Sequence, residues 1–346
     1  MVVFIYMKTI KTKIGIPRSL FYYYYYPGLE EFFQDLGARV ILSPETNRKI
    51  FDRGVKKSVD DICLPIKAYF GHIYELLDKV DYIFAPRFIS LGKKSFACPK
   101  FMGLPDMLKA AFSDKKLPQL IDPDIDLRNG FFPLRKIAHR IGRCIKAGYF
   151  KIEWALWRAI RRQKKFEKIN KLGYTTIESI EIMRDLQQTK ELKNKFAEKS
   201  HDKNNLLTIA ILGHSYLIYD EYLSMGLIKI LKDMKINILT QDMIKNNILE
   251  ENANRYHKKL FWYYNRHILG AAYYLINNKK DEIDGLIQVD AFGCGPDSIV
   301  NELIKLRCKK NNMSFLNINL DEHSGQAGIK TRLEAFTDLL VRRKNG

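Results

Sequence analysis

The sequence lacks any long hydrophobic run. No stretch approaches the roughly 18 consecutive apolar residues that a membrane-spanning helix needs. The apolar start, residues 1–7, is too short for a signal peptide, and no small-residue cleavage site follows it. We therefore expect a cytoplasmic protein that has no membrane partner.

Cysteine is scarce and odd in number. Five cysteines among 346 residues do not suit a disulfide framework in a reducing compartment. They also lack the compact spacing of a ferredoxin or of paired zinc knuckles. Metal binding or plain burial remains open for them. Cys144 and Cys308 lie in helical patterns without Gly or Pro beside them, so we expect those two to be ordinary small core residues.

The familiar phosphate-binding and nucleophile loops are absent as well. The sequence contains neither a Gly-x-Gly-x-x-Gly loop nor a Walker loop, and Gly-His-Ser at 213–215 is not a nucleophile elbow. The sequence therefore offers no sign that this chain binds a dinucleotide or hydrolyses ATP itself.

Acidic residues are few compared with basic ones. The chain has 58 Lys and Arg against 39 Asp and Glu, a formal net charge of +19, and residues 134–205 alone carry 19 against 8. Such an excess is typical either of a surface for a polyanion or acidic partner, or of lysines that solvate helix faces. No helix-turn-helix, zinc-finger or RNA-recognition pattern is present, so we favour the second interpretation and do not expect a nucleic-acid partner.

The chain is rich in alternating strand and helix patterns. A hydrophobic content of 46% and a charged content of 28% are those of a soluble globular protein, and the length suits two domains. Residues 13–17 read as a buried strand, 20–36 as a helix ending at Gly37 and 39–44 as a second strand, which together make a βαβ unit.

This rhythm returns after a purely helical middle. The predicted strands of the second half are residues 206–212, 236–240, 285–290 and 315–320, whereas 135–150, 151–172 and 176–198 predict three helices. We therefore predict an α/β fold with two doubly wound, Rossmann-like parallel-sheet domains, at 8–132 and 206–346, and a basic helical insert at 133–205.

Three cysteines lie where such sheets bind ligands, beside the ends of strands. Cys63, Cys98 and Cys294 each have Pro or Gly close by, and Cys63 and Cys294 precede predicted helices. A helix amino end stabilises a thiolate. Thiolates are the usual holders of iron–sulfur clusters, and three of them leave one metal position open. Zinc is the second candidate metal, with His214 or His323 as a possible fourth ligand.

Several motifs in both halves are distinctive together. They are Ile-Gly-Ile-Pro-Arg at 14–18, Asp-Ile-Cys-Leu-Pro-Ile-Lys at 61–67, Ala-Pro-Arg at 85–87, Cys-Pro-Lys-Phe at 98–101, Phe-Gly-Cys-Gly-Pro-Asp at 292–297 and Asp-Glu-His-Ser-Gly-Gln-Ala-Gly at 321–328. With them the chain resembles the acyl-CoA dehydratase activase-related proteins. That family is similar in turn to the subunits of 2-hydroxyacyl-CoA dehydratases and benzoyl-CoA reductases. The helical middle carries the least of the resemblance.

The resemblance implies a [4Fe–4S] cluster on Cys63, Cys98 and Cys294. It implies a separate ATP-hydrolysing activase as electron donor, and an acyl-CoA substrate that this chain would dehydrate or reduce, as a homo- or heterodimer. A non-catalytic electron carrier or activase-docking protein is the alternative function, and a polyanion or nucleic-acid binder is the third.

Secondary roles are assigned to a few other polar residues. Arg18, Arg87 and Lys100 are candidates to bind the phosphates of CoA, and His214 or His323 to move a proton. A core position is the competing interpretation for His323. The tyrosine run at 22–26 predicts a buried helix face rather than a cofactor platform.

Overall fold

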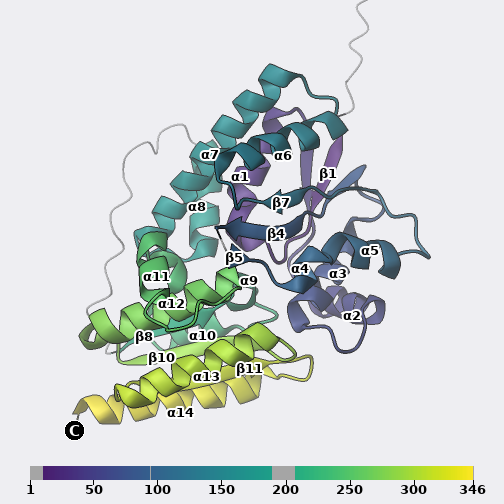
Figure 1. The fold of residues 1–346 in the computed structure, drawn as a ribbon. Coiled ribbons are helices and arrows are strands. Elements are labelled where there is room, and N and C mark those ends of the chain that lie inside the picture. The colour runs from purple at the N-terminus through teal and green to yellow at the C-terminus, as the bar shows by residue number, and fades with distance from the viewer. Residues whose placement is uncertain (1–10, 94, 189–206, 346) are drawn as a thin grey trace, which may run out of the picture.

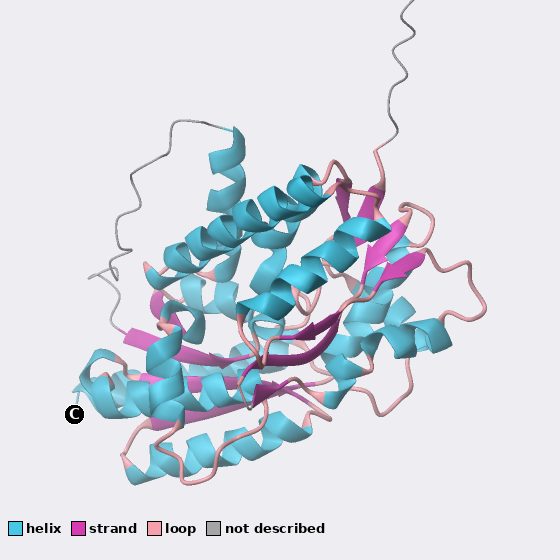
Figure 2. Ribbon diagram, turned by 45° about the horizontal axis from the view of Figure 1, so that its top comes forward, coloured by secondary structure: helices cyan, strands magenta, loops and turns pink. Residues whose placement is uncertain are grey.

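The computed structural model describes residues 11–93, 95–188 and 207–345. Two α/β lobes lie side by side, with a group of helices from the middle of the chain along one flank (Figures 1 and 2). The predicted fold class, α/β with parallel sheets, is confirmed. No helix of the described residues combines the length and the apolar character that crossing a bilayer requires.

The first lobe contains a four-stranded parallel sheet. Its order is β2-β1-β3-β6, formed by β1 (Lys13–Ile16), β2 (Arg39–Leu42), β3 (Tyr82–Phe84) and β6 (Gln119–Ile121). Ile14, Ile16 and Ile83 are almost fully buried, which is expected for a parallel sheet covered by helices. The helices of this lobe are α1 (Tyr22–Asp35), α2 (Arg48–Lys57), α3 (Leu64–Leu76), α4 (Pro99–Met102) and α5 (Leu104–Ala111).

The second lobe also contains a four-stranded parallel sheet. Its order is β11-β10-β8-β9, formed by β8 (Leu207–Gly213), β9 (Ile236–Thr240), β10 (Gly285–Ala291) and β11 (Ser314–Leu320). Its helical elements are α9 (Ser215–Ile218), α10 (Leu227–Asp233), η1 (Gln241–Met243), α11 (Asn246–Ala253), α12 (Tyr263–Asn278), η2 (Lys280–Glu282), α13 (Gly295–Lys310) and α14 (Gln326–Asn345).

Helices cover both faces of this second sheet. Ile287 shares a core with Leu227 and Leu333 of α10 and α14, whereas Leu286 shares another with Ile268 of α12 and residues of α13. Successive residues of a strand point to opposite faces, so the two cores confirm a doubly wound arrangement.

A small third sheet was not predicted from the sequence. It has the order β5-β4-β7, with β4 (Arg87–Gly92), β5 (Ser95–Phe96) and β7 (Asp124–Asp126). Phe96 of β5 also forms an isolated bridge with Trp262 of the second lobe, and the Phe96 backbone N–H donates to the carbonyl of Phe261 at 2.7 Å. This sheet therefore ties the two lobes together by main-chain pairing.

Two predicted helices have different limits in the structure. The sequence of residues 221–234 predicts one helix before β9, but the structure has only α10 there, because Met225 and Gly226 adopt positive φ angles and residues 221–226 form turns. The helix expected over 176–198 is α8 (Thr176–Gln188), and the rest of that expectation lies outside the described residues.

The helical middle is packed along the first lobe and reaches the second lobe at one end. α6 (Phe131–Cys144) and α7 (Tyr149–Lys171) follow each other, and α7 lies against α1. A Cβ on Gly28 of α1 would lie 3.2 Å from the carbonyl oxygen of Ala159, so the absence of a side chain there permits the close approach. At its other end Lys171 Nζ donates to the carbonyl of Asp242 in η1 at 2.6 Å, so α7 contacts both lobes.

The tyrosine run forms much of the contact between the lobes. Tyr22, Tyr23 and Tyr26 are buried, as the sequence predicted. The Ser215 N–H donates to Tyr24 Oη at 3.0 Å, and the Tyr25 and Tyr264 hydroxyls are hydrogen-bonded at 3.0 Å. α1 therefore links the two lobes with polar contacts inside an aromatic core.

Candidate functional site

A narrow pocket, partly open to solvent, lies where the lobes meet. Residues of both lobes line it. They are Cys63, Pro65, Phe96, Cys98, Lys100, Phe101, His214, Tyr216, Trp262, Tyr263, Tyr264, Asn265, Cys294 and Pro296. The pocket faces the ends of β8 and β10, which is where parallel sheets of this kind bind ligands.

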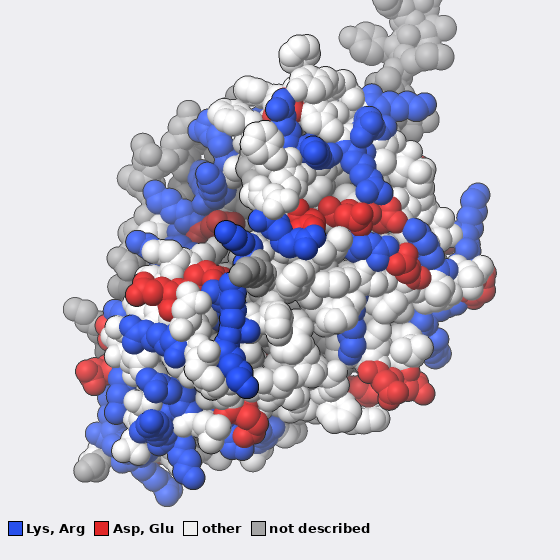
Figure 3. Space-filling model, viewed as in Figure 1, with Lys and Arg blue, Asp and Glu red and all other residues white. Residues whose placement is uncertain are grey.

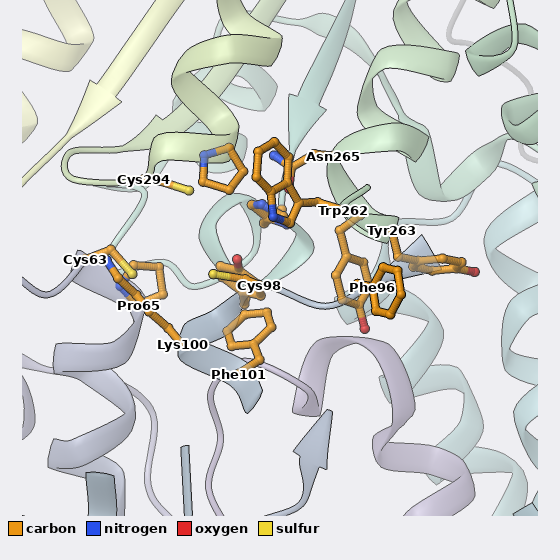
Figure 4. A pocket seen from close by; sticks show the side chains of 14 residues that line it. Cys63, Pro65, Phe96, Cys98, Lys100, Phe101, Trp262, Tyr263, Asn265 and Cys294 are labelled. Atoms are coloured by element: carbon orange, nitrogen blue, oxygen red, sulfur yellow. The ribbon is translucent and has the colours of Figure 1, made fainter. Parts of the chain in front are cut away.

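The three predicted cysteines come together in this pocket. Cys63 and Cys98 belong to the first lobe and Cys294 to the second, and Figure 4 shows their sulfur atoms turned toward the same space. All three are half-buried. Residues separated by more than 190 positions in the sequence therefore present thiols to one site.

Each of these cysteines immediately precedes a helix. Cys63, Cys98 and Cys294 are the N-cap residues of α3, α4 and α13, and each of those helices has Pro in its first turn. Proline suits the first turn because it has no N–H to leave unsatisfied there. The Pro that follows each cysteine by one or two residues thus starts a helix and leaves the cysteine at its amino end.

Two further N-cap residues line the same pocket. His214 precedes α9 and Trp262 precedes α12. Helix amino ends carry unpaired N–H groups and partial positive charge, which favours anions nearby. Five helix starts around one space make an environment that suits a group of negative charge, such as several thiolates.

The loop before Cys294 depends on a glycine. Gly293 has φ of +75°, a left-handed conformation that a residue with a Cβ adopts at a cost. A Cβ there would lie 3.7 Å from the carbonyl of Asp61, so this loop of the second lobe touches the loop that leads to Cys63. Lys100, two residues after Cys98, donates from its Nζ to the Gly293 carbonyl at 3.3 Å. The segment of Cys98 therefore contacts the loop before Cys294.

Burial opposes the ionisation of the free thiols. It raises the pKa of Cys63 and of Cys98, and the positive charge of Lys100 offsets part of each rise. Burial also raises the pKa of Cys294, and the charge of Asp297 adds to that rise. The thiols are therefore protonated at neutral pH on their own, and a metal centre would have to displace these protons to bind.

A buried polar triad lies next to Cys294. Asp297 Oδ1 lies 3.0 Å from His214 Nε2 and accepts a hydrogen bond from Asn265 Nδ2 at 2.5 Å. Ligand atoms of His214, Cys294 and Asp297 all lie within 4.8 Å of one another, so these three could also hold a single ion. His214 Nδ1 and Asp297 Oδ2 are buried without a hydrogen-bond partner among the described residues.

Aromatic side chains form the rest of the wall. Tyr216 stacks on the His214 ring, with centroids 4.8 Å apart and planes 7° apart. Phe96, Phe101, Trp262 and the neighbouring tyrosines complete a mostly apolar lining. Such a lining excludes water and strengthens electrostatic interactions inside the pocket.

A buried lysine braces the first turns of α3. Lys67 is 3% exposed, and its Nζ donates to the Asp60 carbonyl at 2.8 Å and to Glu322 Oε1 at 3.0 Å. Through this ion pair, Glu322 of the Asp-Glu-His segment after β11 contacts the first lobe. Its partner, Lys67, lies four residues after Cys63 in the sequence. Sequence reasoning gave no role to Glu322 or Lys67.

Other candidates lie outside the pocket. Arg18 pairs with Glu45 at 2.6 Å, and His323 is exposed after β11. Arg87 pairs with Asp106 at 2.7 Å and donates to the Met102 carbonyl at 2.5 Å, so it fastens the end of α4.

The remaining cysteines stand apart from the site. Cys308 is fully buried, as predicted. Cys144 is only half-buried at the edge of the core, which corrects the expectation of an ordinary core residue, because the end of α6 lies near the surface.

Asp297 and Asn265 were missed as site residues. The sequence shows Asp297 only as an acidic residue in the first turn of a helix, a common position for helix stabilisation. Its burial beside His214 depends on the packing of α12 and α13 over the sheet.

The comparisons with known proteins add one family. The model of the CoA enzyme activase uncharacterised domain matches residues 13–244. No curated protein matches the sequence. The solved structure of a periplasmic binding protein/LacI transcriptional regulator from Alkaliphilus metalliredigens QYMF, complexed with D-xylulofuranose, is 10% identical, covers 90% of this chain and 97% of its own, and has a TM-score of 0.20. A score that low supports no conclusion about fold or ligand.

Proposed function

The chain belongs to the family of the CoA enzyme activase uncharacterised domain, and from that premise we propose that it binds a [4Fe–4S] cluster on Cys63, Cys98 and Cys294. The cluster would receive an electron from a separate ATP-hydrolysing activase and deliver it to an acyl-CoA that is dehydrated or reduced. One observation carries the proposal: three cysteines from distant segments cap three helices around one pocket.

The residues present fit such a group. Three thiolates would be the protein ligands, the helix amino ends and Lys100 would offset their charge, and Gly293 and Gly295 leave room beside Cys294. When bound, a cluster on three cysteines supplies a low-potential electron and one iron that is open to an oxygen ligand.

The neighbouring residues would handle the proton and the solvent. Asp297 holds the His214 ring by Nε2, which leaves Nδ1 free to accept or give a proton. Tyr216 fixes the plane of that ring, and the aromatic lining keeps water from the pocket.

A single ion such as zinc is the competing occupant, because His214, Cys294 and Asp297 offer three donors within 4.8 Å. That arrangement would break the contact of Asp297 with His214 and would leave Cys63 and Cys98 unused. We therefore favour the cluster.

Anaerobic purification with metal analysis separates the two occupants. The proposal predicts a brown protein with about four iron and four sulfide per chain and a paramagnetic signal after reduction. One zinc per chain, with iron absent, would refute it and favour the single ion.

Product formation by the reduced protein separates an enzyme from a carrier. If the chain is catalytic, the reduced protein should convert an acyl-CoA either to the enoyl-CoA and water, with the electron returned to the cluster, or to a reduced acyl-CoA, with the cluster reoxidised. If no acyl-CoA of these classes is converted, while the cluster still accepts electrons from the activase, the chain is an electron carrier.

A further inference from the structure

A second groove, unrelated to the cysteines, lies along α7. It is open, with about 780 Å³ of empty space, and is lined by Glu31, Trp157, Arg158, Arg161, Arg162, Lys165 and Met183. Figure 3 shows Lys and Arg side chains gathered over the upper left of the molecule, where α7 runs in Figure 1. The four cations of this lining follow one another along α7 at intervals of three, one and three residues, so they share one face of the helix. They are Arg158, Arg161, Arg162 and Lys165.

Two of these cations are already neutralised. Arg158 forms ion pairs with Glu31 and, at 2.9 Å, with Asp35. Arg162 lies 3.5 Å from Glu31 Oε2 and 3.8 Å from Glu30. These acids belong to α1, so the pairs hold α7 against α1 and also cancel the one carboxylate that lines the groove.

The other two cations have no acidic partner among the described residues. Arg161 lies over the indole ring of Trp157, with its Cζ 4.6 Å from the centroid, and Lys165 follows one turn later. Like charges four residues apart on a helix repel each other.

An anion that bridges both cations would remove this repulsion. The Cβ atoms of residues four apart on a helix are about 5–6 Å from each other, which allows one ligand with two charged groups to reach both. Stacking on Trp157 holds the guanidinium of Arg161 while its N–H groups remain available, and guanidinium groups bind phosphate oxygens in pairs.

We propose that the groove on α7 binds a diphosphate group between Arg161 and Lys165. Inorganic pyrophosphate, a nucleoside diphosphate and the diphosphate of CoA share that chemistry. The proposal does not depend on the cluster, because none of these residues lines the cysteine pocket.

Calorimetric titration of the full-length protein at low salt tests the proposal. Pyrophosphate, ADP and CoA should each bind at one site, and orthophosphate should bind at least about tenfold more weakly. Arg161→Ala and Lys165→Ala should each weaken pyrophosphate binding about tenfold, since each removes a charged partner. Both residues are exposed, so the variants should fold, which thermal unfolding verifies.

Lys164→Ala is the matched control. Lys164 is an exposed lysine of the same helix that does not line the groove, so its replacement should leave the affinity for pyrophosphate unchanged. Tighter binding of ADP than of pyrophosphate would support the site and indicate a contact of the base with the exposed indole of Trp157.

Three results would overturn the proposal. They are no binding of any diphosphate, equal weakening by Lys164→Ala and Arg161→Ala, and binding of single-stranded RNA in the absence of pyrophosphate binding. The last result would assign the face to a nucleic acid instead.

Discussion

Asp220 offers a test of how the lobes are joined. Its carboxylate is 2% exposed and accepts hydrogen bonds from the Leu223 N–H at 3.0 Å, from Tyr23 Oη at 3.3 Å and from Thr46 Oγ1. Tyr23 and Thr46 belong to the first lobe. Burial raises the pKa of Asp220 from 3.8 to about 6, although these hydrogen bonds oppose the rise.

The sign of the pH effect follows from that shift. The pKa in the folded state exceeds the unfolded value, so folding favours the neutral carboxyl, and this contribution is lost as the pH rises through about 6. A shift of about two units at about 1.4 kcal/mol per unit amounts to about 3 kcal/mol. Asp220→Asn keeps the size of the side chain and removes its ionisation.

The free energy of unfolding of Asp220→Asn, minus that of the wild type, should therefore rise by about 2 kcal/mol between pH 4 and pH 7, because part of the unfolded carboxyls are already ionised at pH 4. Urea unfolding of the reduced, metal-free proteins measures this difference. Other titrating groups cancel because both proteins contain them, and Asp281→Asn at an exposed position is the surface control. A difference that stays constant with pH, or falls, would refute the reasoning.

Two further stability predictions use matched pairs. Gly54→Ala should destabilise the fold by about 3 kcal/mol or more, because its Cβ would lie 1.8 Å from the Lys67 carbonyl. Gly148→Ala should not destabilise it, because no atom lies within 4 Å of the added Cβ. Equal effects of the two variants on the free energy of urea unfolding would contradict this prediction. Glu322→Gln should cost about 1–3 kcal/mol in the same assay, because it leaves the buried Lys67 charge without its partner. Glu302→Gln removes an exposed pair of similar length and should have no measurable effect; a loss as large as that of Glu322→Gln would contradict the role of burial.

Most strands of the two main sheets were predictable as short apolar runs, whereas β6, whose first residue Gln119 is exposed, was not predicted. β10 is buried along its whole length, and its apolar run is interrupted only by Gln288 and Asp290 before the loop that leads to Cys294. The small third sheet was not predictable. Its strands are as short as two residues, and Phe96 finds its partner Trp262 far along the chain.

The cysteines of the candidate site were also predictable, since the Pro and Gly beside them mark helix starts and the ends of strands share one edge of a sheet. Their convergence across two lobes was expected from the family resemblance, and the structure brings them to one pocket. Asp297 and Lys67 were not predictable, because they look like surface charges in the sequence and are buried in the fold.

The iron content of single-cysteine variants tests the central claim most directly. Cys63→Ser, Cys98→Ser and Cys294→Ser, purified without oxygen, should each lose most of the iron and sulfide, whereas Cys308→Ser, outside the pocket, should keep about four of each per chain. Full iron content in all three pocket variants would contradict the account.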